Sequence, residues 1–390
     1  MNLSNNGFQG NLPFSFGEMK KIEFLDLSHN NFSGTLPIKL LTSCYKLFTW
    51  KLSYNSFTGQ IFSQPTKLTS MMVLIADNNQ FTGIGDGLLN STGLVYFDLS
   101  NNLLQGVIPS WFGGFHFMYF SASDNLINGT IPSSLFNIPF KLLDLSRNKF
   151  SGSLPSNFSG RDMGLLYLYD NEFSGLVPST LLENAMLLDM RSVRASRGMF
   201  ASIGVEAKLF VFLDLPLEFY LDYSGYLDFS VEFTSKRRYD SYTGESFDFI
   251  FGLDFSDIEL SGEIPRELGD LQRMRALNLS YNSLSGSIPS QGNFFTLDET
   301  NYIGNPFLCG SPVNRSCDDN NTTGEKETNY RRKDGGVAID MEMFYWSLGT
   351  SYTVILMTFI VLLNDREEKM TEPSCRVLLL RNNRLRGHIP

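Results

Sequence analysis

The chain has 390 residues, with 31 Lys and Arg against 41 Asp and Glu, which gives a net charge of −10 at pH 7. This acidic balance argues against a nucleic-acid partner, because a phosphate backbone selects basic surfaces. The three histidines, His29, His116 and His388, are far apart in the sequence, so they predict neither a histidine-based triad nor a metal cluster.

A short phrase recurs along the first half of the chain. One copy is LDLSHNNFSGTLP, from Leu25 to Pro37, and an earlier copy is LSNNGFQGNLP, from Leu3 to Pro13. A spacing of 23 to 25 residues separates the asparagines that close successive copies, which are Asn6, Asn30, Asn55, Asn79, Asn102, Asn125, Asn148 and Asn171. A period in this range with an L-x-L-x-x-N core is typical of leucine-rich repeats.

Each residue type in the phrase has a physical role. Leu25 and Leu27 lie on one side of a short strand, so stacked copies bury them in a core that no single repeat can close. The amide of Asn30 donates and accepts, so stacked asparagines can satisfy backbone groups at the turn. Gly34 permits a bend that a Cβ would obstruct. Residues 1–190 are therefore predicted to be a leucine-rich-repeat solenoid, an α/β horseshoe with a parallel β-sheet on its concave face.

Residues 191–251 interrupt the repeats. They hold fourteen aromatic residues, which is too apolar for a solvated linker, so we expect this insert to fold against the solenoid. The repeats return over residues 252–290 as LDFSDIELSGEIP and LNLSYNSLSGSIP. Ile258 occupies the asparagine position of the first of these, which predicts a break in the asparagine ladder and a weaker coil.

The segment after the last repeat reads as a cap. Residues 291–317 include GNPFLCGSPVNRSC, in which Cys309 and Cys317 lie close together and are predicted to form a disulfide. Residues 318–342 are polar and acidic, so no packed core is expected in this juxtamembrane linker.

An uncharged apolar segment follows. Residues 343–363, MFYWSLGTSYTVILMTFIVLL, extend roughly 30 Å as a helix and predict one transmembrane span, the alternative being a buried helix. Ser347, Gly349 and Ser351 would allow another helix to approach closely. The tail, residues 364–390, carries one more repeat phrase, VLLLRNNRLRGHIP. A coil beyond a bilayer could not stack on the solenoid, and a lone repeat is not expected to fold.

Candidate binding residues lie at outward strand positions of the concave face. One such row is expected to consist of Asp26, Lys51, Ile75, Asp98, Ser121, Asp144, Tyr167 and Asp189. Tyrosines combine an apolar ring with a polar tip, as binding surfaces favour, although incidental surface is the alternative; the candidates are Tyr96, Tyr119, Tyr167 and Tyr169. In the insert, a basic and aromatic group could meet an anionic or aromatic partner or pack on its neighbours: Lys236, Arg237, Arg238, Tyr239 and Tyr242.

Other motifs concern modification and catalysis. Sequons that predict N-glycosylation stand at Asn31, Asn90, Asn128, Asn157, Asn278, Asn314 and Asn321. We find no kinase motif set, no phosphate-binding glycine loop in the required context and no metal-ligand spacing, so the sequence predicts no catalytic residue, no metal and no cofactor.

Three segments together resemble a known family. KRRYDSYTGESFDFIFGLDFS (Lys236 to Ser256), ELSGEIPRELGDL and GNPFLCG, in this order, resemble plant leucine-rich-repeat receptor-like proteins, which are cell-surface receptors with a repeat ectodomain, one membrane span and no kinase. The resemblance implies a single-pass plasma-membrane glycoprotein whose N-terminal part is extracellular. It also implies a peptide, protein or glycan ligand, and an adaptor or co-receptor kinase that engages the transmembrane and juxtamembrane region.

The same resemblance has departures. The family's signal peptide and cysteine-bearing N-terminal cap do not precede the first repeat, and the tail phrase is foreign to the family, which indicates a truncated or rearranged copy. The leading hypothesis is a membrane-anchored receptor that binds an extracellular ligand and signals through a partner receptor kinase in defence or development. The alternatives are a cell-wall inhibitor of a pathogen glycoside hydrolase and a receptor gene fragment without function.

Overall fold

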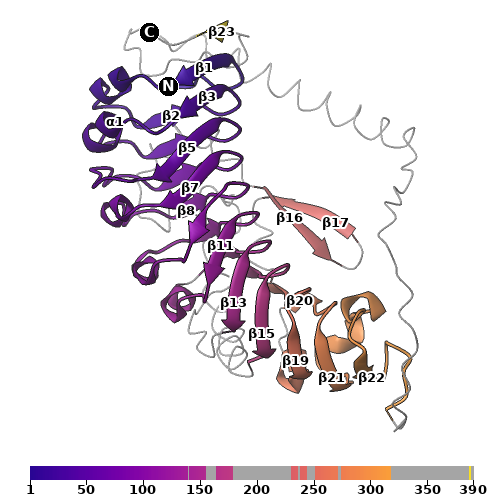
Figure 1. Ribbon diagram of the computed structural model, residues 1–390. Helices are drawn as coiled ribbons and strands as arrows, with labels where there is room; N and C mark the ends of the chain where they lie inside the picture. The colour runs from indigo at the N-terminus through magenta and orange to yellow at the C-terminus, as the bar shows by residue number, and fades with distance from the viewer. Residues whose placement is uncertain are drawn as a thin grey trace, which may run out of the picture. The chain divides into compact units, whose positions relative to one another are not determined.

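In the computed structural model the chain forms stacked coils, most of which contribute one strand to a concave sheet and one to a lateral sheet (Figure 1). The structure describes residues 1–138, 140–154, 164–178, 230–235, 238–243, 251–270, 274–317 and 386–387. The chain divides into two compact units, residues 1–318 with 379–390 and residues 319–378, and all described residues belong to the first.

The concave sheet follows the order of the coils. Its nine parallel strands are β2 (Phe24–Asp26), β4 (Thr49–Lys51), β6 (Val73–Ile75), β8 (Tyr96–Asp98), β10 (Tyr119–Ser121), β12 (Leu142–Asp144), β14 (Leu165–Tyr167), β18 (Phe251–Asp254) and β20 (Met274–Asn278). The middle residue of each three-residue strand is at most 1% exposed, as Leu25, Phe97 and Leu166 illustrate. The strands are buried on this inner side in one continuous core, as the leucine alternation predicts.

One expectation about this sheet was wrong. The row of outward residues was expected to pass from Tyr167 to Asp189, but β14 pairs directly with β18 and places Tyr167 opposite Asp254. A coil needs an asparagine turn as well as a strand, and the residues after Met190 do not supply that phrase. The insert therefore leaves and re-enters between two adjacent coils.

The lateral strands form two sheets, because their pairing is interrupted between β7 and β9. The first contains β23 (Arg386–Gly387), β1 (Gly7–Asn11), β3 (Asn31–Gly34), β5 (Ser56–Ile61) and β7 (Gln80–Ile84). The second contains β22 (Phe307–Cys309), β21 (Ser283–Ser287), β19 (Leu260–Glu263), β15 (Glu172–Leu176), β13 (Lys149–Ser153), β11 (Leu126–Gly129) and β9 (Gln105–Gly106). The phrase glycine needs a positive φ, 74° at Gly34, where a Cβ would lie 2.4 Å from the side-chain oxygen of Asn11.

Short helical turns complete the coils. They are η1 (Phe14–Glu18), α1 (Ile38–Ser43), η2 (Asp86–Asn90), η3 (Ser110–Gly114), η4 (Ser133–Asn137), η7 (Arg266–Asp270), η8 (Gly292–Thr296) and η9 (Glu299–Asn301). Pro13, Pro37, Pro109 and Pro132 each stand immediately before such a turn with φ between −60° and −64°. Proline fixes this φ at a position whose N–H no helix needs, so it starts the turn without a lost hydrogen bond.

An asparagine ladder joins consecutive coils. At Asn148, the side-chain oxygen accepts from the amide of Ile127 at 3.0 Å, and Nδ2 donates to the carbonyl of Ala122 at 2.9 Å and of Leu145 at 3.2 Å. The same pattern recurs from Asn30 to Asn171 and again at Asn282 and Asn305. Buried backbone groups at the turn are satisfied in this way, as the phrase predicts.

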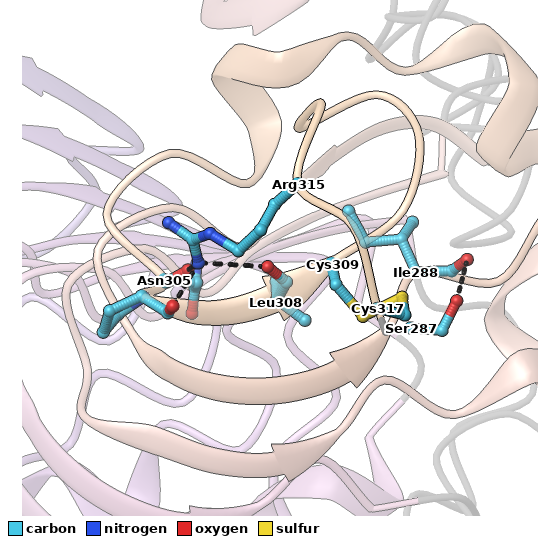
Figure 2. The surroundings of a disulfide bond; sticks show 8 residues. Ser287, Ile288, Asn305, Leu308, Cys309, Arg315 and Cys317 are labelled. Carbon is cyan, nitrogen blue, oxygen red and sulfur yellow. Dashed lines mark hydrogen bonds between the residues drawn. A yellow bond between two sulfur atoms is a disulfide. The ribbon is translucent and has the colours of Figure 1, made fainter. Parts of the chain in front are cut away.

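The cap continues the stack beyond β21. Asn305 supplies a further ladder position, and Cys309 at the end of β22 forms a disulfide with Cys317 (Figure 2). The guanidinium of Arg315 donates to the carbonyls of Pro306 and Leu308, the latter at 3.1 Å. The cap thus satisfies carbonyl groups that a further coil would otherwise bond.

The tail phrase corrects a second expectation. It was not expected to stack, yet β23 pairs in parallel with β1, opposing Arg386 to Gly7 and Gly387 to Phe8. Figure 1 shows β23 beside β1, at the end of the stack where the N-terminus lies. β1 is therefore paired on both sides, with β3 and with the strand of the tail phrase.

The predicted transmembrane helix at 343–363 lies outside the described residues. Within the described ranges, no helix combines the length and the apolar character that a membrane crossing requires.

Candidate functional site on the concave sheet

Two rows of side chains project from the outer face of the concave sheet. The tyrosine row precedes the inward residue of each strand and consists of Phe24, Thr49, Val73, Tyr96, Tyr119, Leu142, Leu165, Gly252 and Ala276. The aspartate row follows it and consists of Asp26, Lys51, Ile75, Asp98, Ser121, Asp144, Tyr167, Asp254 and Asn278. Parallel pairing in register therefore brings residues from different coils side by side.

The aspartates of this row are held by serines of the same coil. Asp98 Oδ1 accepts from the amide of Ser100 at 3.0 Å and from its hydroxyl at 2.7 Å. Ser146 binds Asp144 in the same way, at 3.0 and 2.6 Å. The L-D-L-S pattern thus fixes each of these two carboxylates through one oxygen.

Tyr96 and Tyr119 stack against each other beside these carboxylates. Their ring centroids are 4.0 Å apart with 10° between the ring planes. Burial raises the pKa of both phenols well above the ordinary value, and the charge of Asp98 adds to this effect. The two rings are half-buried and form a flat, uncharged platform.

Asp98 is the most perturbed carboxyl of the face. Burial, followed by the negative charge of Asp77 on the neighbouring coil, raises its pKa to about 7. Burial likewise raises the pKa of Asp144. The sequence placed Asp98 and Asp144 in the outward row but did not distinguish them from its other members. The available signal was Asp77, at the position that most coils fill with serine.

A second platform lies two coils further along. Leu142, Leu165 and Tyr167 form an apolar cluster on the outer face, separate from the core, with Tyr119, Tyr169 and Ala276 packed against it. Tyr167 is 8% exposed, so this candidate is buried rather than a free surface tyrosine. Its neighbours in this cluster, Leu142 and Leu165, are aliphatic, so its ring packs against apolar side chains.

Tyr169 stands at the edge of this cluster. Its ring is half-buried and meets Tyr167 edge-on at 6.4 Å. The guanidinium of Arg147 lies 5.4 Å from the Tyr169 centroid and also pairs with Asp124 at 3.1 Å. The structure therefore brings the four predicted tyrosines onto one face, as two pairs with different surroundings.

The insert residues are described only in part. Lys236 and Arg237 lie outside the described residues, whereas Arg238, Tyr239 and Tyr242 lie on β17 (Arg238–Thr243), which pairs antiparallel with β16 (Ser230–Ser235). β16 also contacts β20 of the concave sheet. The hairpin is thus placed next to the concave sheet at its last strand.

The sequons occupy different surfaces. Asn31, Asn90, Asn128 and Asn314 are exposed, whereas Asn157 and Asn321 lie outside the described residues. Asn278 lies in the aspartate row, where its amide donates to Asp254 at 3.2 Å and its oxygen accepts from Ser280. Glycosylation of Asn278 would have to break these contacts.

Among the described residues, His, Cys, Asp and Glu do not gather into a group that could hold a metal ion.

Comparison with known proteins places these features in context. The family model for the leucine-rich repeat matches residues 21–42, 93–115, 140–160 and 273–294. Receptor-like protein 9a of Arabidopsis thaliana is 52% identical over 93% of this chain and 52% of its own length. Receptor-like protein 9b of the same plant is 47% identical over the same shares. The chain thus spans about half the length of the curated relatives it matches.

Solved structures agree on the fold. The Arabidopsis receptor kinase HAESA, in complex with the peptide hormone IDA and the co-receptor SERK1, superimposes with a TM-score of 0.56 at 26% identity. The match covers 82% of this chain and 42% of that one.

Proposed function

Because the chain belongs to the plant leucine-rich-repeat receptor-like proteins, we propose that its concave sheet binds an extracellular ligand and that the protein signals through a partner receptor kinase. The observation that carries this proposal is the stacked pair of Tyr96 and Tyr119 beside the carboxyl of Asp98. An aromatic platform next to fixed acidic groups suits an extended peptide that carries a cationic side chain. The HAESA complex with a peptide hormone and a co-receptor supports this ligand class by fold similarity.

The charge of the site defines the preferred ligand further. Asp77, Asp98 and Asp144 come from three coils of one face, and Arg147 is paired with Asp124 at its edge. A basic group of the ligand would lie over the carboxyls while its apolar side chains contact the tyrosines. Because the pKa of Asp98 is raised to about 7, such a ligand should bind more tightly at pH 8 than at pH 5.

A binding experiment tests this proposal. The full chain would be titrated with a fluorescent library of extended synthetic peptides, half of them with one lysine or arginine and half with a neutral residue there. We expect Tyr96→Ala and Asp98→Asn each to weaken the best basic peptide roughly 10-fold. Tyr45→Ala, at an exposed tyrosine away from the concave sheet, is the matched control and should change nothing. Equal affinities for basic and neutral peptides would contradict the proposal.

Membrane anchoring is a separate part of the proposal. The 21 uncharged residues at 343–363 support a single span that would hold the solenoid outside the plasma membrane and present its small residues to a partner's span, in defence or development signalling. Carbonate washing of membranes from expressing plant cells provides the test. The chain should stay in the membrane pellet, and release into the wash would contradict anchoring.

A further inference from the structure

We infer that the outer edge of β1 is a docking surface for a leucine-rich-repeat coil, and that its occupant is the tail phrase of the same chain, residues 378–390. This inference goes beyond the proposed receptor function and does not depend on it. It begins from the pairing of β23 with β1, which joins segments at opposite ends of the chain.

The pairing of β23 with β1 has the same register as the pairing of β1 with β3. Between β1 and β3, Gly10 lies opposite Phe32, so the phrase glycine of one coil faces the phrase phenylalanine of the next. Between β23 and β1, Gly387 lies opposite Phe8 in the same manner. Arg386 opposes Gly7 just as Gln9 opposes Asn31. β23 is therefore related to β1 as β1 is related to β3.

The sequence reaches the same register independently. LLLRNNRLRGHIP, residues 378–390, aligns without a gap with LDLSHNNFSGTLP, residues 25–37. Under this alignment Gly387 is the phrase glycine, Asn383 the ladder asparagine and Leu385 the phrase phenylalanine. A strand docked by chance would not place its own phrase glycine in the coil position.

With β23 beside β1, the coil of β1 is as buried as the next coil. Leu3 is 4% exposed and Ser4 is 2% exposed, against 0% and 9% for Leu27 and Ser28. Asn6 already donates to the carbonyls of Leu3 and Ser4 within its own coil. The amide of Phe8 donates to the side-chain oxygen of Asn30 in the next coil. By the same pattern, the amide of Leu385 would donate to the side-chain oxygen of Asn6.

Connection length permits the same molecule to supply the coil. The nine strands of the concave sheet extend about 40 Å at roughly 4.8 Å per strand. Residues 319–378 connect the cap to the tail, and an extended chain of this length reaches on the order of 100–200 Å. Because a tethered segment has a local concentration in the millimolar range, its own tail outcompetes that of a second copy.

The inference also constrains the membrane topology. A chain with residues 343–363 across a bilayer holds residues 378–390 on the side away from the solenoid. Docking of the tail phrase on β1 therefore requires a chain in which residues 343–363 have not crossed a bilayer. Peptide binding at Tyr96 requires neither a docked tail nor a membrane span. The binding proposal and the docking proposal can therefore fail separately.

Amide exchange provides the first test. In neighbouring coils the amides of Leu103 and Leu126 donate to carbonyls of the preceding coil, Phe81 and Leu104, both at 2.9 Å. Gly7 holds the equivalent position, so its amide reports on the docked tail. In the purified full chain, Leu385→Asp should speed exchange at Gly7 at least about 10-fold. The control is Arg384→Asp. Its counterpart in the phrase of residues 25–37 is Asn31, which is exposed, so this variant should leave exchange at Gly7 slow.

A cysteine pair provides the second test and identifies the occupant. Gly7→Cys with Arg386→Cys, in a Cys375→Ser background, places two thiols on directly opposed strand residues, which are close enough for a disulfide. We expect an intramolecular bond in the monomer. An interchain bond would assign the edge to a second copy and overturn the occupant. No bond, or exchange at Gly7 that is equally fast in the unsubstituted chain and in Leu385→Asp, would overturn the docking surface itself.

Discussion

The coils before the insert and the coil after it solve the same packing problem differently. From Asn30 to Asn171, each turn is bonded to its neighbour through an asparagine amide. Phenylalanines stack below the turns from Phe8 to Phe81, and again between Phe150 and Phe173, at centroid distances of 6.0 to 6.2 Å. After the insert, Ile258 occupies the asparagine position and is fully buried. In the regular coils a backbone amide donates to the asparagine of the next coil, as the amide of Phe150 donates to Asn171. Ile258 offers no such acceptor to the corresponding amide of Phe173.

This difference separates two sources of stability. The regular coils combine apolar burial with a polar ladder that fixes the register, whereas the coil of β18 relies on apolar burial and on its neighbours. Its local geometry is also less regular, because the β18 pairing shifts register between Phe251 and Gly252, and Glu259 adopts a φ of 53°. A position where the ladder is broken is also where a large insert leaves the stack, since little inter-coil bonding is lost there.

The largest expected effect comes from the interior that both regions share. Leu145 is fully buried in the common core, so Leu145→Asp should lower the free energy of unfolding by more than about 4 kcal/mol. Thermal melting and protease resistance measure the loss. Lys149→Asp, at an exposed position of the same coil, is the control. An unchanged melting temperature in Leu145→Asp would show that the coils do not share an interior.

A reciprocal exchange of the ladder residue sharpens the comparison. Asn148→Leu leaves the amide of Ile127 and the carbonyls of Ala122 and Leu145 without this partner, so we expect a loss of about 3 kcal/mol. Ile258→Asn should change stability by only about 1 kcal/mol, because regained hydrogen bonds offset the lost burial of an aliphatic side chain. Urea denaturation of both variants measures this, and equal losses would refute the distinction.

Removal of the cap disulfide should have a smaller, local effect. Cys309→Ser with Cys317→Ser opens a loop whose ends are 8 residues apart, which costs about 2–3 kcal/mol by the loop-entropy estimate. Amide exchange should accelerate in β22 and β21 and stay slow in β8 and β10. Reduction of the unsubstituted protein is the control and should reproduce the pattern. Acceleration across the whole concave sheet would indicate that the cap, and not the ladder, holds the regular coils together.

The sequence predicted the repeating fold well because each coil carries the same local phrase. Leu25, Asn30 and Gly34 fulfil the roles that their residue types suggest, and the periodicity predicted the order of the coils from Asn6 to Asn171. It did not predict that β14 pairs with β18 or that the tail phrase pairs with β1, because strand pairing across an insert depends on which edges remain available.

The candidate site was predicted less completely. Outward tyrosines could be found by counting positions in the phrase, but burial depends on neighbouring coils. Tyr96 and Tyr119 stack because both occupy the same row, whereas Tyr167 lies on Leu142 and Leu165. The raised pKa of Asp98 requires Asp77 beside it and a buried setting, which a single strand does not reveal.

The smallest expected effect compares a carboxyl of each region. Burial raises the pKa of both Asp98 and Asp254, but Asp98 faces the charge of Asp77, whereas Asp254 receives a hydrogen bond from Asn278 that lowers its pKa. A pKa above the unfolded value of about 3.9 means that the folded chain binds the proton more tightly. The resulting stability is present below about pH 4 and is lost as pH rises through about 7 at Asp98.

The melting temperature of the unsubstituted chain should therefore fall between pH 5 and pH 8, and Asp98→Asn should reduce this fall because the amide is neutral at both pH values. Asp254→Asn should reduce it less, and the exposed Asp170→Asn should not alter it. The Asn side chain can still accept from Ser100, so the fold around position 98 is kept. An Asp98→Asn variant with an unchanged pH slope would mean that Asp98 is ionised at pH 5, and the basic-ligand preference would then not depend on pH.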